Sequence, residues 1–160
     1  MQELVETLAE KLIEKKMMIA TAESCTGGLL SSALTRKAGA SQYFERGFVT
    51  YSDDAKQEQL DVPKNTIILK GAVSNETAEA MAIGALANSN AQIAVSITGV
   101  AGPDGGSHDK PVGTVFFGFA VKGASSISAK NNFEGTRQQI QEQAVIVALK
   151  TLITILDAQS

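Results

Sequence analysis

Residues 17–34 are MMIATAESCTGGLLSSAL, and this stretch decides the expected class of fold. The apolar run Met17–Thr21 predicts a buried strand, and Leu29–Leu34 predicts a helix. Gly27-Gly28 lies between them, where glycine allows a tight turn and lets the backbone approach a ligand closely. A helix start also offers backbone amides that suit an oxyanion or a phosphate. The segment TAESCTGG at 21–28 is therefore predicted to be the active-site turn of an α/β enzyme.

Predicted strands and helices alternate along the rest of the chain. Leu4, Leu8 and Leu12 recur every four residues, the pattern of an amphipathic helix that ends near residue 16. Further strands are predicted at Phe48–Tyr51, Gln92–Thr98, Val112–Val121 and Ser125–Phe133, and helices at Ser52–Leu60, Ser74–Asn88 and from about Thr136, with a loop at Pro63. The last two strands are expected to form an antiparallel hairpin. This alternation predicts a three-layer α/β/α sandwich around a mixed, mainly parallel sheet of about five strands, in one domain spanning residues 1–160.

The composition narrows the class of protein. The 160 residues contain 14 Lys and Arg against 17 Asp and Glu, a net charge of −3 without long runs of either sign, which argues against binding nucleic acid or a membrane surface. The amino terminus lacks the pattern of a signal peptide, and no window approaches a span of about 20 apolar residues. The single cysteine, Cys25, excludes an intramolecular disulfide and a multi-cysteine metal site. A cytoplasmic location is the simplest expectation.

The turn offers two candidate nucleophiles, Ser24 and Cys25. Local composition allows a purely structural alternative, in which Thr26 is a helix cap and Ser24 a turn residue. A nucleophile needs a base, and His108, the one histidine, lies in a glycine-rich loop where it is as easily a solvated side chain. Lys56 follows a strand that ends in a tyrosine, and it acts as a base only if its pKa is lowered. Taken alone, the local sequence favours a solvated helix lysine beside Asp53 and Asp54.

Ligands of such sheets collect at the carboxyl ends of the strands, where Ser24, Tyr51 and Thr98 are expected to meet. The loop that follows Thr98 is GVAGPDGGSHDKPVG at 99–113, which matches neither the P-loop nor the dinucleotide-binding fingerprint. Its amides either hold an anion or form a surface turn. Arg137 lies near the start of the last helix, where a cation opposes the helix dipole, and it either binds a phosphate or carboxylate or is a surface residue.

Taken together, these pieces resemble one family, the carboxy-terminal domain of the competence/damage-inducible protein CinA and its stand-alone relatives, the nicotinamide-nucleotide amidases. The resemblance covers nearly the whole chain and rests on TAESCTGG at 21–28, FERGFVTYSDDAK at 44–56, GAVSNETAEAMA at 71–82, SITGVAGPDGG at 96–106, KPVGTVFFGF at 110–119 and FEGTR at 133–137. It implies hydrolysis of the carboxamide of nicotinamide mononucleotide to nicotinate mononucleotide and ammonia, without a metal or redox cofactor.

The resemblance also implies roles for individual residues. Ser24 is expected to be the nucleophile, Lys56 its base and Tyr51 a supporting hydroxyl in the proton relay. It also implies that Thr98 and Arg137 contact the substrate. From their places in the turn and in the glycine loop, and not from the resemblance, Thr26, Gly27, Gly28, Gly99 and Gly102 are expected to bind the substrate as well. The amides around residues 26–28 are expected to stabilise the oxyanion.

Two positions depart from the family pattern G-D-R-x-x-x-R, because Thr136 and Gln141 stand where members commonly have aspartate and a second arginine. If either lost side chain normally binds phosphate, substrate affinity or identity differs here. Two alternatives therefore stay open: an amidase that uses Cys25 with His108, and a catalytically silent module that docks to a DNA-repair or competence partner. The chain resembles a stand-alone amidase, and a homo-oligomer is expected.

Overall fold

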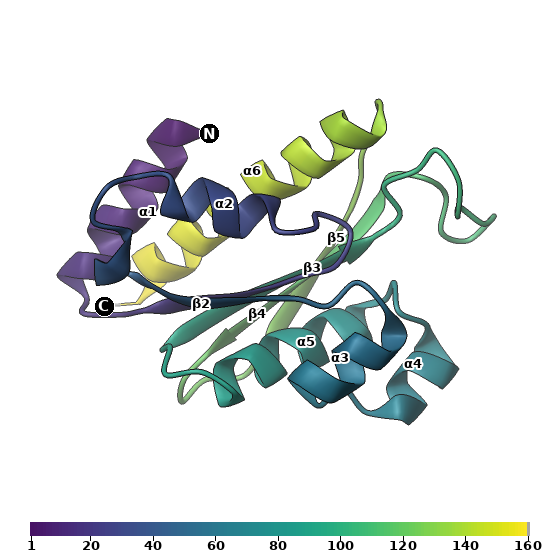
Figure 1. Ribbon diagram of the computed structural model, residues 1–160, viewed down its shortest axis with the longest axis horizontal. Helices are drawn as coiled ribbons and strands as arrows, with labels where there is room; N and C mark the ends of the chain where they lie inside the picture. Colours follow the sequence, from purple (N-terminus) through teal and green to yellow (C-terminus); the bar gives the residue numbers. More distant parts are fainter. Residues whose placement is uncertain (160) are drawn as a thin grey trace.

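The computed structural model describes residues 1–159, which form a five-stranded sheet between two layers of helices (Figure 1). The predicted domain ends at residue 160, which lies outside the described part of the chain. In chain order the elements are α1 (Gln2–Glu14), β1 (Ile19–Glu23), α2 (Leu29–Thr35), the 3-10 turn η1 (Ala40–Gln42), β2 (Phe44–Val49), α3 (Asp53–Leu60), α4 (Lys64–Lys70), α5 (Asn75–Ala87), β3 (Ile93–Gly99), β4 (Thr114–Val121), β5 (Ile127–Asn132) and α6 (Arg137–Ala158).

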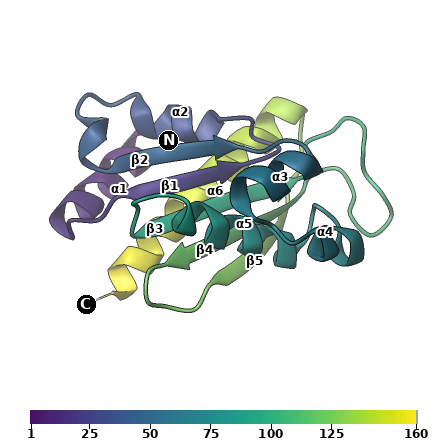
Figure 2. The ribbon, with the colours of Figure 1, turned by 60° about the horizontal axis from the view of Figure 1, so that its bottom comes forward.

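The strand order across the sheet is β2-β1-β3-β4-β5, as Figure 2 shows. β1 pairs in parallel with both β2 and β3, whereas β4 pairs antiparallel with β3 and with β5. Four strands thus run in one direction and β4 alone runs in the other, so the predicted mixed, mainly parallel sheet is confirmed. The antiparallel β4–β5 hairpin is also as predicted.

Each face of the sheet has its own apolar core. Helices α1, α2 and α6 cover one face, and α3, α4 and α5 cover the other (Figure 1). The larger core joins leucines of α1 and α6 to the strands, and the smaller one joins Met81 of α5 and Leu60 of α3 to the opposite face. By length and composition, α6 is the one helix in the described residues that could cross a membrane. Here its apolar side is part of the larger core.

Two boundaries differ from the sequence prediction in ways that affect the site. β2 begins at Phe44 and ends at Val49, so Tyr51 lies beyond the strand instead of ending it. The sequence pattern did not predict the first half of β2. Its residues FERGFV include polar side chains because this edge strand is largely half-buried or exposed. The second difference is α4, a helix in place of the loop predicted at Pro63. Proline lacks the amide that a helix start leaves unpaired, so it is compatible with the N-cap position that it occupies.

Parallel pairing brings three chain segments to one edge of the sheet. The last residue of β1, Glu23, aligns with Val49 of β2 and with Ile97 of β3. The residues that follow these strands therefore emerge side by side, and the long loop after β3 projects from the same end of the molecule (Figures 1 and 2). This is the edge at which ligands of such sheets bind.

Candidate active site

A cavity of about 270 Å³ lies at this edge of the sheet. Its walls come from the turn after β1, the start of α3, the segment before α5, the loop after β3 and the first residue of α6. The lining residues are Ser24, Cys25, Tyr51, Lys56, Ala72, Val73, Thr98, Gly99, Val100, Ala101, Gly102, Asp104, Gly105 and Arg137. Residues far apart in the sequence therefore converge on one small polar space.

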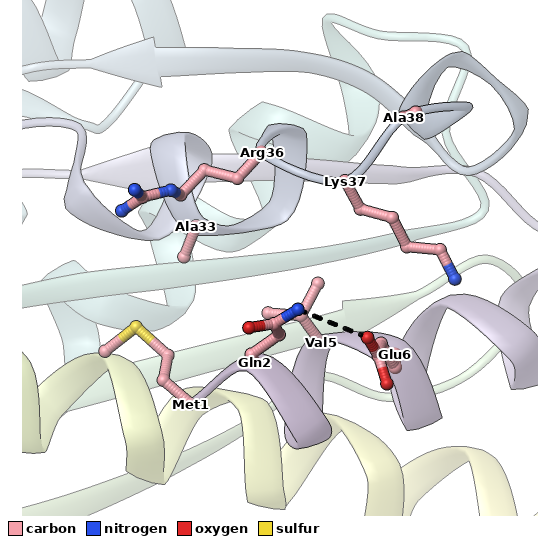
Figure 3. A pocket seen from close by; sticks show the side chains of 8 residues that line it. All are labelled: Met1, Gln2, Val5, Glu6, Ala33, Arg36, Lys37 and Ala38. Atoms are coloured by element: carbon pink, nitrogen blue, oxygen red, sulfur yellow. Dashed lines mark hydrogen bonds between the residues drawn. The ribbon is translucent and has the colours of Figure 1, made fainter.

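A larger cavity, about 610 Å³, lies elsewhere, between the start of α1 and the end of α2 (Figure 3). Its lining is Met1, Gln2, Val5, Glu6, Ala33, Arg36, Lys37 and Ala38, and none of these is a serine, threonine or cysteine. Figure 3 shows a hydrogen bond between the side chains of Gln2 and Glu6 on one helix. This cavity is larger, but the smaller one holds the reactive groups.

Ser24 and Lys56 meet inside the smaller cavity. The Ser24 hydroxyl oxygen lies 3.0 Å from the Lys56 Nζ, within the reach that proton transfer needs. Its other hydrogen-bond contact is longer, 3.4 Å to the Tyr51 carbonyl. Lys56 is only 1% exposed, although its local sequence favoured a solvated helix lysine. The Ser52 hydroxyl caps α3 by accepting from the Ala55 amide, and the helix that follows carries Lys56 inward.

The surroundings of the amine favour its neutral form. Burial lowers the pKa of Lys56, and the negative charge of Asp53 opposes that shift only in part. Nζ lies 2.9 Å from the Thr50 carbonyl and 3.1 Å from the Tyr51 carbonyl. A neutral amine has two hydrogens for these two carbonyls, and its lone pair then faces the Ser24 hydroxyl. The arrangement can therefore accept the serine proton without histidine.

Several groups of the turn are bound within the turn, and the expectation that its amides hold an anion stays a prediction. The Gly27 amide donates to the Ser24 carbonyl at 3.0 Å, and the Thr26 hydroxyl donates to the Glu23 carboxylate at 2.6 Å. Gly28 has a positive φ of 108°, a conformation that glycine adopts without strain. Within residues 1–159, the cavity lining does not include Thr26, Gly27 or Gly28. The Gly27 amide and the Thr26 hydroxyl thus hold the turn together.

Cys25 and His108 are not brought together. Burial raises the pKa of the Cys25 thiol to about 12, so the thiol stays protonated at neutral pH. His108 is exposed in the loop after β3, and the cavity lining within residues 1–159 does not include it. A cysteine–histidine pair therefore has neither the thiolate nor the geometry in this structure.

Arg137 links two walls of the cavity. Its guanidinium donates to the Tyr51 hydroxyl at 2.9 Å and to the Gly102 carbonyl at 2.7 Å. The Tyr51 hydroxyl is thus held by an arginine, while its main-chain carbonyl contacts the base. In this structure the Tyr51 hydroxyl contacts Arg137, and its expected place in the proton relay stays a prediction. Arg137 and Tyr51 lie at the mouth of the cavity, where Tyr51 is 60% exposed.

Thr98 and the glycines of the loop also lie where expected, on the cavity wall. The Thr98 hydroxyl donates to the Ala72 carbonyl at 2.8 Å, which leaves its lone pairs as acceptors. A side chain at Gly99 would collide with the neighbouring strand, since a Cβ there would lie 2.7 Å from the Thr114 carbonyl oxygen. Glycine is therefore required at this position for the loop to turn back over the sheet edge.

With this geometry established, comparison with known proteins places the chain. Residues 1–156 match the family model of the CinA C-terminal domain. The chain belongs to the CinA C-terminal domain family.

Named relatives of this CinA-family chain cover almost its full length. It is 46% identical over 152 residues to nicotinamide-nucleotide amidohydrolase PncC of Escherichia coli (strain K12), a match of 95% of this chain and 92% of that protein. The protein of the same name from Enterobacter agglomerans is also 46% identical, over 96% of this chain and 93% of its own length. The crystal structure of competence/damage inducible protein CihA from Agrobacterium tumefaciens superposes with a TM-score of 0.94 at 42% identity, covering 98% and 94% of the two chains. The expected family and fold are confirmed.

The two departures from the CinA pattern have structural roles here. Thr136 caps α6 in a capping box, its hydroxyl accepting from the Gln139 amide while the Gln139 side chain accepts from the Thr136 amide. Threonine and aspartate both serve as N-caps, so this exchange preserves the helix start. Gln141 donates to the Cys25 carbonyl at 2.9 Å and so braces the turn next to the nucleophile.

Sequence reasoning missed three parts of this CinA-family site. They are the Glu23 carboxylate, the Gln141 amide and the Thr50 carbonyl. Glu23 adjoins the nucleophile in the quoted motif, and its place at the end of an apolar strand was the available signal. The contacts of Gln141 and Thr50 depend on how α6 and α3 approach the turn, which local sequence patterns do not encode.

Proposed function

We propose that this CinA-family domain hydrolyses the carboxamide of nicotinamide mononucleotide to nicotinate mononucleotide and ammonia. The observation that carries the proposal is the 3.0 Å approach of the Ser24 hydroxyl to the buried Lys56 amine inside a cavity. The names of the two 46% identical relatives support the choice of an amide-bearing nicotinamide nucleotide. Residues 1–160 act in this proposal as one catalytic domain.

In the first half of the reaction, the Ser24 oxygen attacks the carboxamide carbon while neutral Lys56 takes the hydroxyl proton. The tetrahedral intermediate then collapses, the carbon–nitrogen bond breaks, and Lys56 returns the proton to the departing nitrogen as ammonia forms. In the second half, Lys56 takes a proton from water and the resulting hydroxide attacks the ester. The bond from the acyl carbon to the Ser24 oxygen then breaks, Lys56 returns the proton to that oxygen, and the carboxylic acid leaves. In each half, Lys56 first accepts a proton and then returns it.

The Cys25 amide is the proposed donor to the oxyanion. Because the peptide bond is planar and trans, the Ser24 carbonyl and the Cys25 amide point in opposite directions. The carbonyl accepts from the Gly27 amide within the turn, so the Cys25 amide points away from that bond. Cys25 lines the cavity, whereas Thr26 to Gly28 do not. An amide directly after the nucleophile is a recurrent oxyanion donor in serine hydrolases.

The charged residues of the lining fit a nucleotide that carries both signs of charge. Arg137 offers a planar guanidinium to a phosphate and is the proposed phosphate ligand, and it would exchange its bonds to Tyr51 and Gly102 on binding. Asp104 supplies a carboxylate on the same wall, which suits the positive pyridinium ring. The Thr98 hydroxyl and the backbone at Gly99 complete the proposed substrate contacts. Expected cytoplasmic location and homo-oligomeric assembly stay predictions.

The test is ammonia release from nicotinamide mononucleotide by the purified protein. Wild type is expected to release ammonia and nicotinate mononucleotide in equal amounts, and Ser24→Ala to lose the activity. Absence of release by wild type, or full release by Ser24→Ala, would refute the proposal. Cys25→Ala and His108→Ala are expected to stay active, and loss of activity in both would instead support the cysteine–histidine alternative.

A further inference from the structure

Glu23 is a buried carboxylate that the proposed reaction does not use. It is the last residue of β1, directly before the nucleophile, and is 0% exposed. Among residues 1–159, the ion pairs are Lys11–Asp157, Arg46–Glu45 and Lys70–Glu76, so no cation neutralises Glu23. Burying an unpaired carboxylate costs free energy unless hydrogen bonds compensate for the lost hydration. A buried carboxylate directly before Ser24 therefore needs an explanation.

Four donors surround this carboxylate. One oxygen accepts from the Thr26 hydroxyl at 2.6 Å and the Leu30 amide at 2.8 Å. The other accepts from the Ser31 amide at 2.9 Å and the Ser31 hydroxyl at 2.6 Å. The N-cap of α2, Gly28, has no side chain to bond these helix amides, so Glu23 reaches across the turn to do so. The carboxylate therefore occupies the anion position at the start of α2.

These bonds hold the nucleophile from both sides. Ser24 lies between Glu23, whose side chain is anchored on α2, and Thr26, whose hydroxyl is bound to the same carboxylate. The Ser24 amide donates to the Ile97 carbonyl at 2.9 Å, which ties the turn to β3. The main chain at Ser24 and Cys25 is thus enclosed by the bond between the side chains of Glu23 and Thr26, which restricts the direction of the Ser24 side chain.

The main chain of Glu23 extends the same support to the base. Its carbonyl accepts from the Thr50 amide at 2.9 Å, and the Thr50 carbonyl accepts from Lys56 Nζ at 2.9 Å. Nucleophile and base, 32 positions apart in sequence, are therefore both braced through Glu23. We infer that Glu23 is a positioning residue that sets the Ser24–Lys56 distance for catalysis, an inference that rests on the proposed function of that pair.

The bonding pattern makes glutamine an informative replacement. Each carboxylate oxygen accepts one backbone amide, from Leu30 or from Ser31. In whichever orientation a glutamine side chain lies, its NH₂ group faces one of these amides, and two donors cannot bond each other. Glu23→Gln keeps the volume but must shift the turn. A misplacement of about 1 Å at reacting groups costs on the order of 100-fold in rate.

The experiment compares Glu23→Gln, Thr26→Val and Tyr43→Phe with wild type. Thr26→Val removes the donor within the turn and keeps the other three bonds of Glu23. Tyr43→Phe is the matched control, because its buried hydroxyl donates to the Leu34 carbonyl at the opposite end of α2. The measurements are kcat and KM for nicotinamide mononucleotide, the Tm, and the rate at which a serine-directed fluorophosphonate labels Ser24.

A positioning role predicts that Glu23→Gln lowers kcat about 10- to 100-fold while KM changes less than about threefold. The labelling rate should fall with kcat, and Thr26→Val should show a smaller loss of the same kind. Tyr43→Phe should lower Tm and leave kcat near wild type. If Glu23→Gln does not fold, Thr26→Val decides.

The inference is overturned if the folded variants turn over and label at wild-type rates, or if Tyr43→Phe loses as much kcat for the same drop in Tm. Labelling separates this result from failure of the proposed function. A wild-type protein that is labelled at Ser24 but releases no ammonia refutes the substrate, and the labelling rates of the variants still test Glu23.

Discussion

Lys56→Met tests two properties of the buried amine. The amine accepts a proton in the proposed reaction, and burying its protonated form lowers the free energy of unfolding. Methionine has similar length and is apolar, so it fills the space beside Ser24 without a lone pair that accepts a proton. A positioned general base contributes about 10²- to 10⁴-fold to rate, and the 3.0 Å distance to the Ser24 hydroxyl is the distance that such a base requires. The kcat of Lys56→Met should therefore fall by about that factor.

The same change alters how stability depends on pH. Burial holds the pKa of Lys56 below its ordinary value of 10.5, so between the folded-state pKa and 10.5 the unfolded chain binds one more proton than the folded one. The contribution of Lys56 to the free energy of unfolding of wild type should rise with pH across that window, by at most about 1.4 kcal/mol per pH unit. Above about pH 9 the raised pKa of the Cys25 thiol opposes this rise equally in wild type and in Lys56→Met. Below the folded-state pKa, the free-energy cost of burying the protonated amine is fully present and does not change with pH. Above 10.5 it is gone.

In Lys56→Met this rise should disappear. The carbonyls of Thr50 and Tyr51 lose a donor, at roughly 1–3 kcal/mol each if they are left unsatisfied, which offsets the removal of the buried amine at neutral pH. The pH slope is therefore more diagnostic than the stability at one pH.

Urea unfolding from pH 7 to 10 and ammonia release at saturating substrate measure the two effects. Lys64→Met, at an exposed position of α4, is the control and should match wild type in both. A kcat for Lys56→Met within tenfold of wild type, or an unchanged pH slope, would refute the assignment of this amine as the base.

Three further changes test the surroundings. The negative charge of Asp53 raises the pKa of Lys56, so Asp53→Asn should move the rise of kcat/KM to lower pH. Asp54→Asn, on the same helical turn, is the control and should not shift it. A pH–rate profile measures both variants, and equal shifts would contradict the electrostatic cause. Gln141→Leu removes one bond to the carbonyl after the nucleophile and should lower kcat about 2- to 10-fold in steady-state assays, with no loss counting against that brace. Gly84→Ala normally favours a helix by about 1 kcal/mol, but here a Cβ would lie 1.9 Å from the Leu60 carbonyl oxygen, so urea unfolding should show a destabilised protein.

The sequence predicted the elements whose patterns are local. The apolar run before Ser24 and the glycines after it predicted the strand, turn and helix, because strand burial and glycine conformation act over a few residues. The hairpin of β4 and β5 followed from two adjacent apolar runs. What failed was set by context: the first half of β2 lies at a half-exposed sheet edge and has no apolar alternation to detect.

Prediction of the candidate site was uneven for a related reason. The pairing of Ser24 with Lys56 followed from the family resemblance, since composition alone favoured a solvated lysine. The burial that makes this lysine a candidate base comes from the packing of α3 on the sheet and α5, which appears only once the chain is folded. Thr26 makes a contact that its motif position did not reveal. Its motif position suggested a substrate contact, but Glu23 binds its hydroxyl.

The two buried ionisable residues of this site, Glu23 and Lys56, have different surroundings, and the difference supports the proposal of a base other than histidine. Glu23 receives four hydrogen bonds, which compensate the burial of its carboxylate and hold its neighbours in place. Lys56 meets two carbonyls and a hydroxyl, none of them a carboxylate, so burial disfavours its charge and lowers its pKa. Because burial is the main cause of that shift, the base needs no second cation beside it. Arg137, on the same cavity wall, is therefore available for the anionic part of a substrate, and basicity and substrate binding depend on separate residues.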